Sequence, residues 1–274
     1  MKLNEKLLEV NKQTEILSAY IAADRIEASL KQNAGVISEL AKVMHDKRPE
    51  QIIFVGSGAS YCTLYTGYYY LRTTSKVPVQ HFFGPELVVD DPPALRWDNI
   101  VAILASYSGK TADTVAASEF LKDRGVVRIA LSKDDAGPLA GDCEYVLSYQ
   151  DKCLYTSAMA NLLAMLAGYL RLRGEGEPAR EMEDALQRIP DQMRGVLEKA
   201  ERRAMADLER VADDDHFYVL GDGALWALAY QFGYTNLMEY SRVHAACLRS
   251  CEWRHGPLEV QFREPAMVLS LIHI

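Results

Sequence analysis

The sequence has 274 residues, with 30 Lys and Arg against 38 Asp and Glu, which gives a formal net charge of −8. That length suggests two domains or one large one, since a domain usually holds about 100 to 200 residues. A hydrophobic share of 49% and a charged share of 25% exclude disorder as the main state. Phosphate neutralisation needs a basic face, so we expect no nucleic-acid partner for this acidic chain.

The five cysteines lack the spacing of a metal site. Cys247 and Cys251 are four residues apart, but no second Cys or His pair completes a zinc set. Reduced thiols in a cytoplasmic protein are the simplest interpretation, and the first ten residues do not resemble a signal peptide. The longest apolar stretch, residues 158–170, is too short to span a bilayer. We therefore expect no metal, no membrane association and a cytoplasmic location.

The first half of the chain alternates short apolar runs with stretches of helical periodicity. It opens with a helical pattern, which we assign to an N-terminal segment at 1–34. The apolar runs are hydrophobic along their whole length, as is typical of parallel strands buried on both faces. Five strands alternating with helices are therefore predicted, which indicates an α/β fold: 51–55, 77–83, 99–105, 126–131 and 145–148.

The second half repeats the beginning of this pattern. A charged stretch at 171–190 is expected to be a surface connection into a long helix at 190–211. The run 217–220 then precedes Gly-Asp-Gly-Ala, just as 53–55 precedes Gly-Ser-Gly-Ala. The offset of 165 residues (221 − 56) indicates a duplicated α/β unit. The second copy has one more apolar run, 266–271, so we expect it to be truncated.

Two turns follow predicted strands at the edge where open α/β sheets bind ligands. In Gly56-Ser-Gly-Ala-Ser60, the glycines let backbone N–H groups approach an anion. Residues 106–114 carry three hydroxyls, those of Ser106, Ser108 and Thr111, at the start of a predicted helix. An N-cap needs only one hydroxyl, so both capping and phosphate binding remain possible.

The acid–base candidates lie in the second unit. Residues 236–247 have helical periodicity, and Glu239 lies among apolar neighbours. A carboxylate there is either a salt-bridged structural residue or a base with a raised pKa. His255 precedes Gly256-Pro257, which fixes it in a turn, a frequent setting for a proton-transferring His. His244 is five residues from Glu239, off its helical face, and is expected to pack.

These motifs resemble those of one protein family. Residues 106–114 resemble the phosphate loop of sugar isomerase (SIS) domains. Met238-Glu-Tyr together with Glu252-Trp-Arg-His-Gly-Pro-Leu-Glu259 resembles the Amadori deglycases of that family, which split fructoselysine 6-phosphate and related compounds. The similarity covers about residues 35–265. It implies tandem SIS domains, each a flavodoxin-like parallel sheet flanked by helices, at 35–172 and 212–274, with a linker and helix at 173–211.

The resemblance implies a deglycase that cleaves a fructosamine 6-phosphate without a cofactor. In the family the active site typically lies at a homodimer interface, with the His supplied across it. Cys251 stands where a deglycase usually has Gly, so the loop that carries His255 is expected to differ locally. No role follows for Glu86 or Lys110. The implied phosphate ligands are Ser60, Ser106, Ser108 and Thr111, with Glu239 as general base and His255 as general acid or ring-opening group.

Two other functions are compatible with the same motifs. One is an aldose–ketose phosphosugar isomerase of the glucosamine-6-phosphate synthase type, although these residues contain no glutaminase domain with an N-terminal Cys nucleophile. The other is a sugar-phosphate-binding SIS protein without activity. No basic helix-turn-helix lies before residue 35, which counts against the DNA-binding version. None of the motifs identifies the amine half of a substrate.

Overall fold

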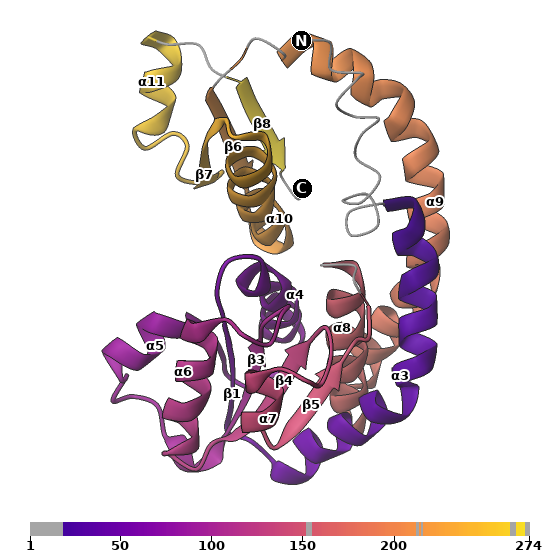
Figure 1. The fold of residues 1–274 in the computed structure, drawn as a ribbon, viewed down its shortest axis with the longest axis vertical. Helices are drawn as coiled ribbons and strands as arrows, with labels where there is room; N and C mark the ends of the chain where they lie inside the picture. The colour runs from indigo at the N-terminus through magenta and orange to yellow at the C-terminus, as the bar shows by residue number, and fades with distance from the viewer. Residues whose placement is uncertain (1–18, 152–154, 212–213, 215, 264–266, 272–274) are drawn as a thin grey trace.

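The computed structural model describes residues 19–151, 155–211, 214, 216–263 and 267–271. It contains two parallel sheets, one of five strands and one of three, and the long helix α9 (Gly176–Val211) connects them along the chain. Figure 1 shows the larger sheet below, the smaller sheet above and α9 at the side of both. Three expectations fall on residues outside this description: the start of the helical segment, Cys153, and the first and last residues of the second unit.

The larger sheet contains all five strands that the apolar runs predict. Its order is β2-β1-β3-β4-β5, and every neighbouring pair is parallel. In this register Gly56, the last residue of β1, lies between Phe83 and Ala105. The strands are β1 (Gln51–Gly56), β2 (Val79–Phe83), β3 (Ile100–Ala105), β4 (Val127–Ser132) and β5 (Tyr145–Ser148).

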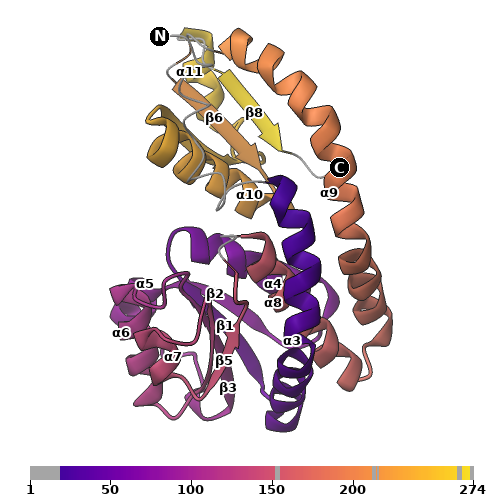
Figure 2. The same ribbon diagram turned by 45° about the vertical axis from the view of Figure 1, so that its right-hand side comes forward.

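Helices cover both faces of this sheet, as Figure 2 shows. Ile52 and Phe54 pack in a core with one set of helices, and Ile53 and Val55 pack in a core with the other set. All four side chains are fully buried, and each such burial stabilises the fold by about 1.5 to 3 kcal/mol. The first set is α3 (Ala19–Lys47), α4 (Ala59–Thr74), α8 (Thr156–Leu172) and the beginning of α9. The second set is α5 (Gly84–Asp90), α6 (Ala112–Lys122) and α7 (Pro138–Asp142). A short 3-10 turn, η2 (Trp97–Asn99), precedes β3.

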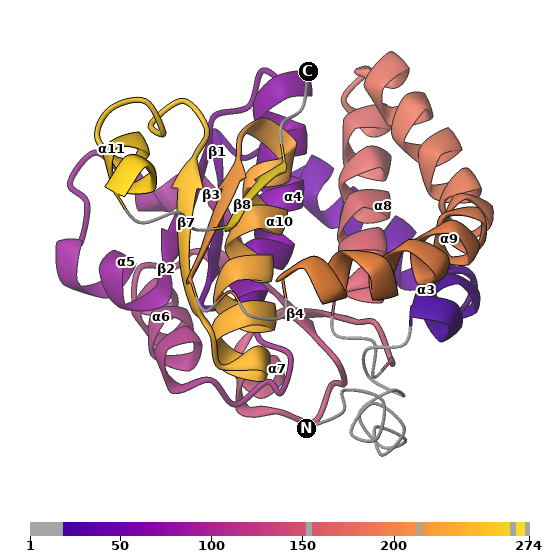
Figure 3. The same ribbon diagram turned by 90° about the horizontal axis from the view of Figure 1, so that it is seen from above.

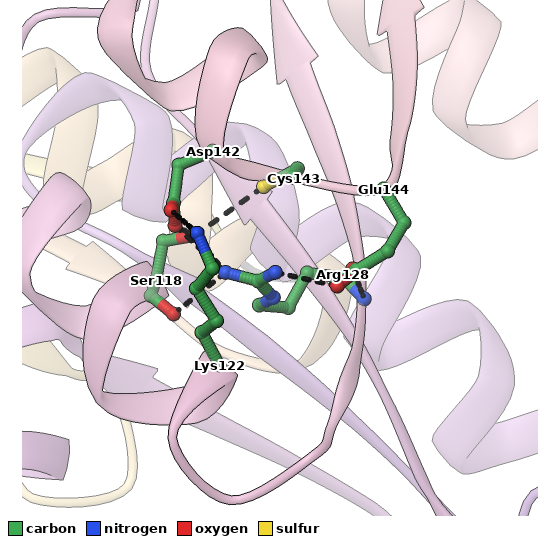
Figure 4. A network of polar contacts seen from close by, with 6 residues as sticks. All are labelled: Ser118, Lys122, Arg128, Asp142, Cys143 and Glu144. Carbon is green, nitrogen blue, oxygen red and sulfur yellow. Dashed lines mark hydrogen bonds and ion pairs between the residues drawn. The ribbon is translucent and has the colours of Figure 1, made fainter.

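A buried arginine joins β4 to α6 and α7 at the edge of the sheet where β4 begins (Figure 4). Arg128 is almost fully buried and donates to the Ser118 carbonyl, to Asp142 at 2.7 Å and to Glu144. Burial alone would raise the pKa of Asp142, but hydrogen bonds from Lys122 and Ser118 and the Arg128 charge lower it. This paired charge belongs to the scaffold and lies away from the carboxyl ends of the strands.

Helix α9 begins earlier than the sequence indicates. The stretch 171–190 was expected to be a surface connection, but α9 starts at Gly176 and continues through Pro190. Pro178 lies in its first turn, where a missing N–H costs nothing. Ala179 and Leu186 are buried, and this packing against the first unit offsets the helix-breaking tendency of Pro190.

The smaller sheet has a strand that the sequence prediction missed. Residues 236–247 were expected to form one helix, but the helix ends at Ser241 and residues 244–249 form β7. Arg242 reverses the chain with a φ of 58°. Pairing with β6 then determines the structure of an alanine-rich segment that has little preference of its own. His244 is therefore on an exposed strand end, and its ring lies 5.2 Å from that of His216.

The order of this sheet is β7-β6-β8, and both pairs are parallel. Seen from above in Figure 3, the sheet and its helices lie over the first unit. Its elements are β6 (His216–Gly221), η3 (Gly223–Leu225), α10 (Trp226–Gln231), the π-helix η4 (Phe232–Ser241), β7 (His244–Arg249), α11 (Pro257–Arg263) and β8 (Met267–Leu271). In the part of the chain described, no helix is both long and apolar enough to cross a membrane.

Candidate functional site

The two predicted anion-binding turns lie side by side. Strands β1 and β3 are neighbours, and Gly56 is paired with Ala105, so the turn at 56–60 and the loop at 106–111 leave the same edge of the sheet. Ser60 and Tyr107 line the same small pocket there. The structure thus brings Ser60 close to the hydroxyl loop, as the sequence predicted.

The hydroxyls of the 106–111 loop do not cap the helix that follows. Thr111 is the N-cap residue of α6, but its side chain makes no capping hydrogen bond. Its Oγ1 lies 2.8 Å from the buried Ser106 Oγ, which also accepts a 3.4 Å hydrogen bond from the Thr111 N–H. Ser108 Oγ accepts from the Lys110 N–H at 3.2 Å. The capping interpretation is therefore wrong for the Thr111 side chain, and the start of α6 is available to an anion.

The loop is held rigidly by its neighbours. The Ser106 N–H donates to the Leu131 carbonyl at 3.1 Å, and the Leu139 N–H donates to the Gly109 carbonyl at 3.0 Å. Gly109 has a φ of 64°, and a Cβ there would lie 3.0 Å from Gly137. Only glycine combines this conformation with so close an approach, so the loop is preorganised.

An aromatic layer on α4 joins the first unit to the second. Cys62, Tyr65 and Ala227 form its buried part. The Arg249 guanidinium lies 4.2 Å above the Trp226 ring and donates to the Tyr65 hydroxyl at 3.4 Å. This contact positions the α10–η4 helix above the edge that carries the two anion-binding turns.

The same layer contains a histidine that the sequence prediction passed over. The His81 ring stacks on Tyr61 with centroids 3.8 Å apart, and neither ring nitrogen has a hydrogen-bond partner among the described residues. Burial lowers the pKa of His81 from 6.5 to about 3. The folded protein therefore holds this ring neutral throughout the usual working range.

Acid should destabilise the protein through His81. The unfolded chain takes up a proton near pH 6.5 and the folded chain does not, so the free energy of unfolding falls as pH drops below about 6.5. The expected loss from this group is about 2 kcal/mol between pH 7 and pH 5. Urea unfolding of His81→Phe at both pH values should show a fall in the free energy of unfolding that is smaller by this amount. His45→Gln, at a partly exposed position, is the control and should leave it unchanged.

Glu239 is exposed in the last turn of η4. Burial raises the pKa of the Tyr240 phenol, and the Glu239 carboxylate and then Tyr107 raise it further. Burial also raises the pKa of Tyr155, which directly precedes α8, and Glu239 is among the charges that add to this. Tyr155 of the first unit is therefore within electrostatic range of Glu239, and Tyr240 is within electrostatic range of both Glu239 and Tyr107.

His255 lies elsewhere. It is exposed in a run of turns between β7 and α11, and its N–H donates to the Glu252 carbonyl at 2.9 Å. The predicted turn is therefore present. Helix η4 leads into the beginning of β7, whereas the His255 turn follows its end. At about 3.3 Å per residue, the six residues of β7 span roughly 16 Å, and Glu239 precedes this strand whereas His255 follows it.

Some polar groups near the site were not identified from the sequence. Ser57 Oγ, in the turn at 56–60, is buried and has no hydrogen-bond partner among the described residues. The Tyr155 hydroxyl, directly before α8, is also buried without a partner among them. Ser57 is part of the glycine turn, so its position alone could have identified it. Glu86 accepts a 3.4 Å hydrogen bond from the Phe83 N–H at the start of α5, and Lys110 is exposed. The Glu86 contact is structural.

Comparisons with known proteins agree with this architecture. Residues 45–169 match the model of the SIS domain. The chain is 26% identical over 241 residues to fructosamine deglycase FrlB of Bacillus subtilis, covering 85% of this chain and 72% of the relative. It is 22% identical over 255 residues to fructoselysine 6-phosphate deglycase of Escherichia coli, covering 93% of this chain and 75% of the relative.

A solved structure shows the same fold. The C-terminal domain of glucosamine-fructose-6-phosphate aminotransferase from Francisella tularensis superposes with a TM-score of 0.79 at 22% identity, covering 94% of this chain and 74% of that one. Both predicted turns, with Ser60, Ser106, Ser108 and Thr111, lie within the residues that match the family model.

Proposed function

We propose that this chain is a deglycase that uses water to cleave a 6-phosphorylated Amadori compound, such as fructoselysine 6-phosphate, into glucose 6-phosphate and a free amine. The observation that carries the proposal is the placement of Glu239. Its carboxylate acts electrostatically on Tyr155 of the first unit and on Tyr240, and Tyr240 is in turn within electrostatic range of Tyr107 in the hydroxyl loop. A base beside an anion-binding loop is what proton transfer on a sugar phosphate needs. The names of the two deglycase relatives support the same reaction.

Ser60, Ser106, Ser108 and Thr111 are the proposed phosphate ligands. Their support is the shared edge of the sheet, the uncapped start of α6 and the rigid loop. Hydroxyl and backbone N–H donors bind phosphate without a cationic side chain, so a net charge of −8 is no obstacle. The same phosphate would hold C1 and C2 of the substrate near Glu239.

Ser106→Ala should weaken substrate binding. It removes one proposed ligand and the partner of Thr111 Oγ1, so KM is expected to rise about tenfold with kcat within about threefold. Steady-state kinetics of amine release gives both values. Ser118→Ala, a buried serine in the scaffold, is the matched control and should leave KM unchanged. An unchanged KM in Ser106→Ala would remove Ser106 from the phosphate site.

The proposed chemistry consists of proton transfers followed by hydrolysis of an imine. The Amadori compound has an amine on C1 and a ketone at C2, so its C1 protons are acidic. Glu239 takes one of them to form an enaminol and returns a proton to C2, which gives an imine at C1. Water adds to this imine, and the carbon–nitrogen bond breaks to give the aldehyde of glucose 6-phosphate and the free amine. His255 is the proposed acid that opens the sugar ring.

We also propose a homodimer with shared active sites. Glu239 and His255 lie beyond opposite ends of β7, so one chain does not place both on the same substrate. The partner's His255 would complete the site that contains Glu239. Tandem SIS domains at 35–172 and 212–274 and a cytoplasmic location belong to the same proposal.

The second candidate is phosphosugar isomerisation on the same site. Its support is the fold shared with the aminotransferase domain. Incubation with fructoselysine 6-phosphate and, separately, with fructose 6-phosphate tests both. A deglycase releases lysine from the first and leaves the second unchanged. Interconversion of fructose 6-phosphate and glucose 6-phosphate, without amine release from the first compound, would establish an isomerase instead.

A further inference from the structure

The loop that carries His255 contains neither helix nor strand. Residues 250–256 form successive turns, held by local hydrogen bonds such as Trp253 N–H to the Ser250 carbonyl at 3.3 Å and Glu252 N–H to the Arg249 carbonyl at 2.9 Å. These bonds define the shape of the loop. They do not fix its direction relative to the sheet, because each of them joins residues within or directly beside the loop.

Two contacts tie the loop to the β6 segment. The Cys251 N–H donates to Asp222 Oδ2 at 3.1 Å, and the Cys251 thiol lies 3.6 Å from Asp222 Oδ1, so the carboxylate accepts from one residue with both oxygens. Nearer to His255, the Trp253 ring packs edge-on against Tyr218 with centroids 5.1 Å apart. Hydrogen bonds to an ionised acceptor are roughly twice as strong as neutral ones, which makes Asp222 the stronger anchor.

The turn that contains Asp222 is itself held by neighbouring residues. It follows β6 in the Gly221-Asp-Gly223 turn, and the Leu225 N–H donates to its carbonyl at 3.0 Å. Gly223 has a φ of 55°, and a Cβ there would lie 3.0 Å from the Tyr69 hydroxyl of α4. The turn thus packs closely on Tyr69, and Asp222 is half-buried.

We propose that Asp222 is a positioning residue that holds the His255 loop through Cys251 and so sets the direction in which His255 projects. The proposal rests on the proposed function for the role of His255. Cys251 lies four residues before His255 in the same loop, and its N–H and thiol both contact Asp222. A misplacement of about 1 Å in a reacting group costs on the order of a hundredfold in rate, so the anchor should affect kcat.

The expected result is a change in kcat that depends on the hydrogen-bond acceptor. Asp222→Ala removes both acceptor oxygens and should lower kcat by about tenfold to a hundredfold, with KM within about threefold. Asp222→Asn keeps one oxygen for the Cys251 N–H and should stay within about threefold of the wild type. Asp123→Ala, at the exposed end of α6, is the control for removing an aspartate charge.

Fluorescence provides a second readout that needs no activity. The chain has three tryptophans, so Trp97→Phe with Trp226→Phe leaves Trp253 as the only one, inside the loop. In that background Asp222→Ala should increase acrylamide quenching of Trp253 at least about twofold, and Asp222→Asn should not. Unfolding curves show whether each variant is folded.

The outcomes separate the two proposals. Unchanged kcat in Asp222→Ala overturns the positioning role, whatever the quenching shows. Equal losses in Asp222→Ala and Asp222→Asn also overturn it, because charge rather than the hydrogen bond would then matter. If the wild-type chain releases no amine, the proposed function fails, and the quenching of Trp253 alone decides whether Asp222 holds the loop.

Discussion

Glu239→Gln is expected to lower kcat for amine release by about a hundredfold to ten-thousandfold, which is the usual contribution of one general base. The amide has nearly the same shape as the carboxylate but cannot accept the C1 proton, so KM should change by less than about threefold. Glu239 is exposed at the end of η4, so the free energy of unfolding should stay within about 0.5 kcal/mol of the wild type. Steady-state kinetics and urea unfolding measure these quantities.

The control for this variant is Glu119→Gln, an exposed carboxylate on α6. It should retain wild-type kinetics. If Glu239→Gln released amine at more than about half the wild-type rate, Glu239 would not be the base. A loss of kcat together with a large rise in KM would indicate a binding role.

Mixing two inactive variants should restore activity. Chains with Glu239→Gln retain His255, and chains with His255→Ala retain Glu239. When equal amounts are unfolded together and refolded, half of the dimers should be mixed, and each mixed dimer has one site with both groups intact. The expected activity is therefore about one quarter of the wild type, from two preparations that are each almost inactive.

Recovery of activity in the mixture tests whether one site uses groups from two chains, because Glu239 and His255 lie beyond opposite ends of β7. Each variant refolded alone is the control and should remain inactive. A mixture that stays inactive while wild-type chains treated in the same way regain full activity would show that both groups act from one chain. That result would contradict the shared site and leave the assignment of Glu239 untouched.

The first sheet could be predicted strand by strand because the patterns that indicate its strands lie within short stretches of the sequence. The central strands β1 and β3 are almost wholly buried apolar runs, since both of their faces are covered, and glycine or polar turns follow their ends. Strand β7 gave no such signal. Its side chains are only half-buried apart from an exposed first residue, and the apolar pattern of η4 continues into it, so pairing with β6 decides its structure.

Part of the candidate site could likewise be predicted from the sequence, and part of it could not. Ser60, Ser106, Ser108 and Thr111 could be assigned to one edge because the ends of parallel strands meet there. Local rules left open whether Thr111 is a capping side chain, because they do not show that Ser106 is its partner. The separation of Glu239 and His255 could not be foreseen, since it depends on the missed strand between them. The contact between Asp222 and Cys251, 29 residues apart, is likewise tertiary.

One measurement tests the central claim most directly. The purified chain is incubated with fructoselysine 6-phosphate, and free lysine and glucose 6-phosphate are quantified over time in the same samples by proton and phosphorus NMR. Unphosphorylated fructoselysine is run in parallel. The account predicts that both products appear at equal rates from the phosphorylated compound and far more slowly from the other. Phosphorylated substrate that remains intact, or equal turnover of both compounds, would contradict it.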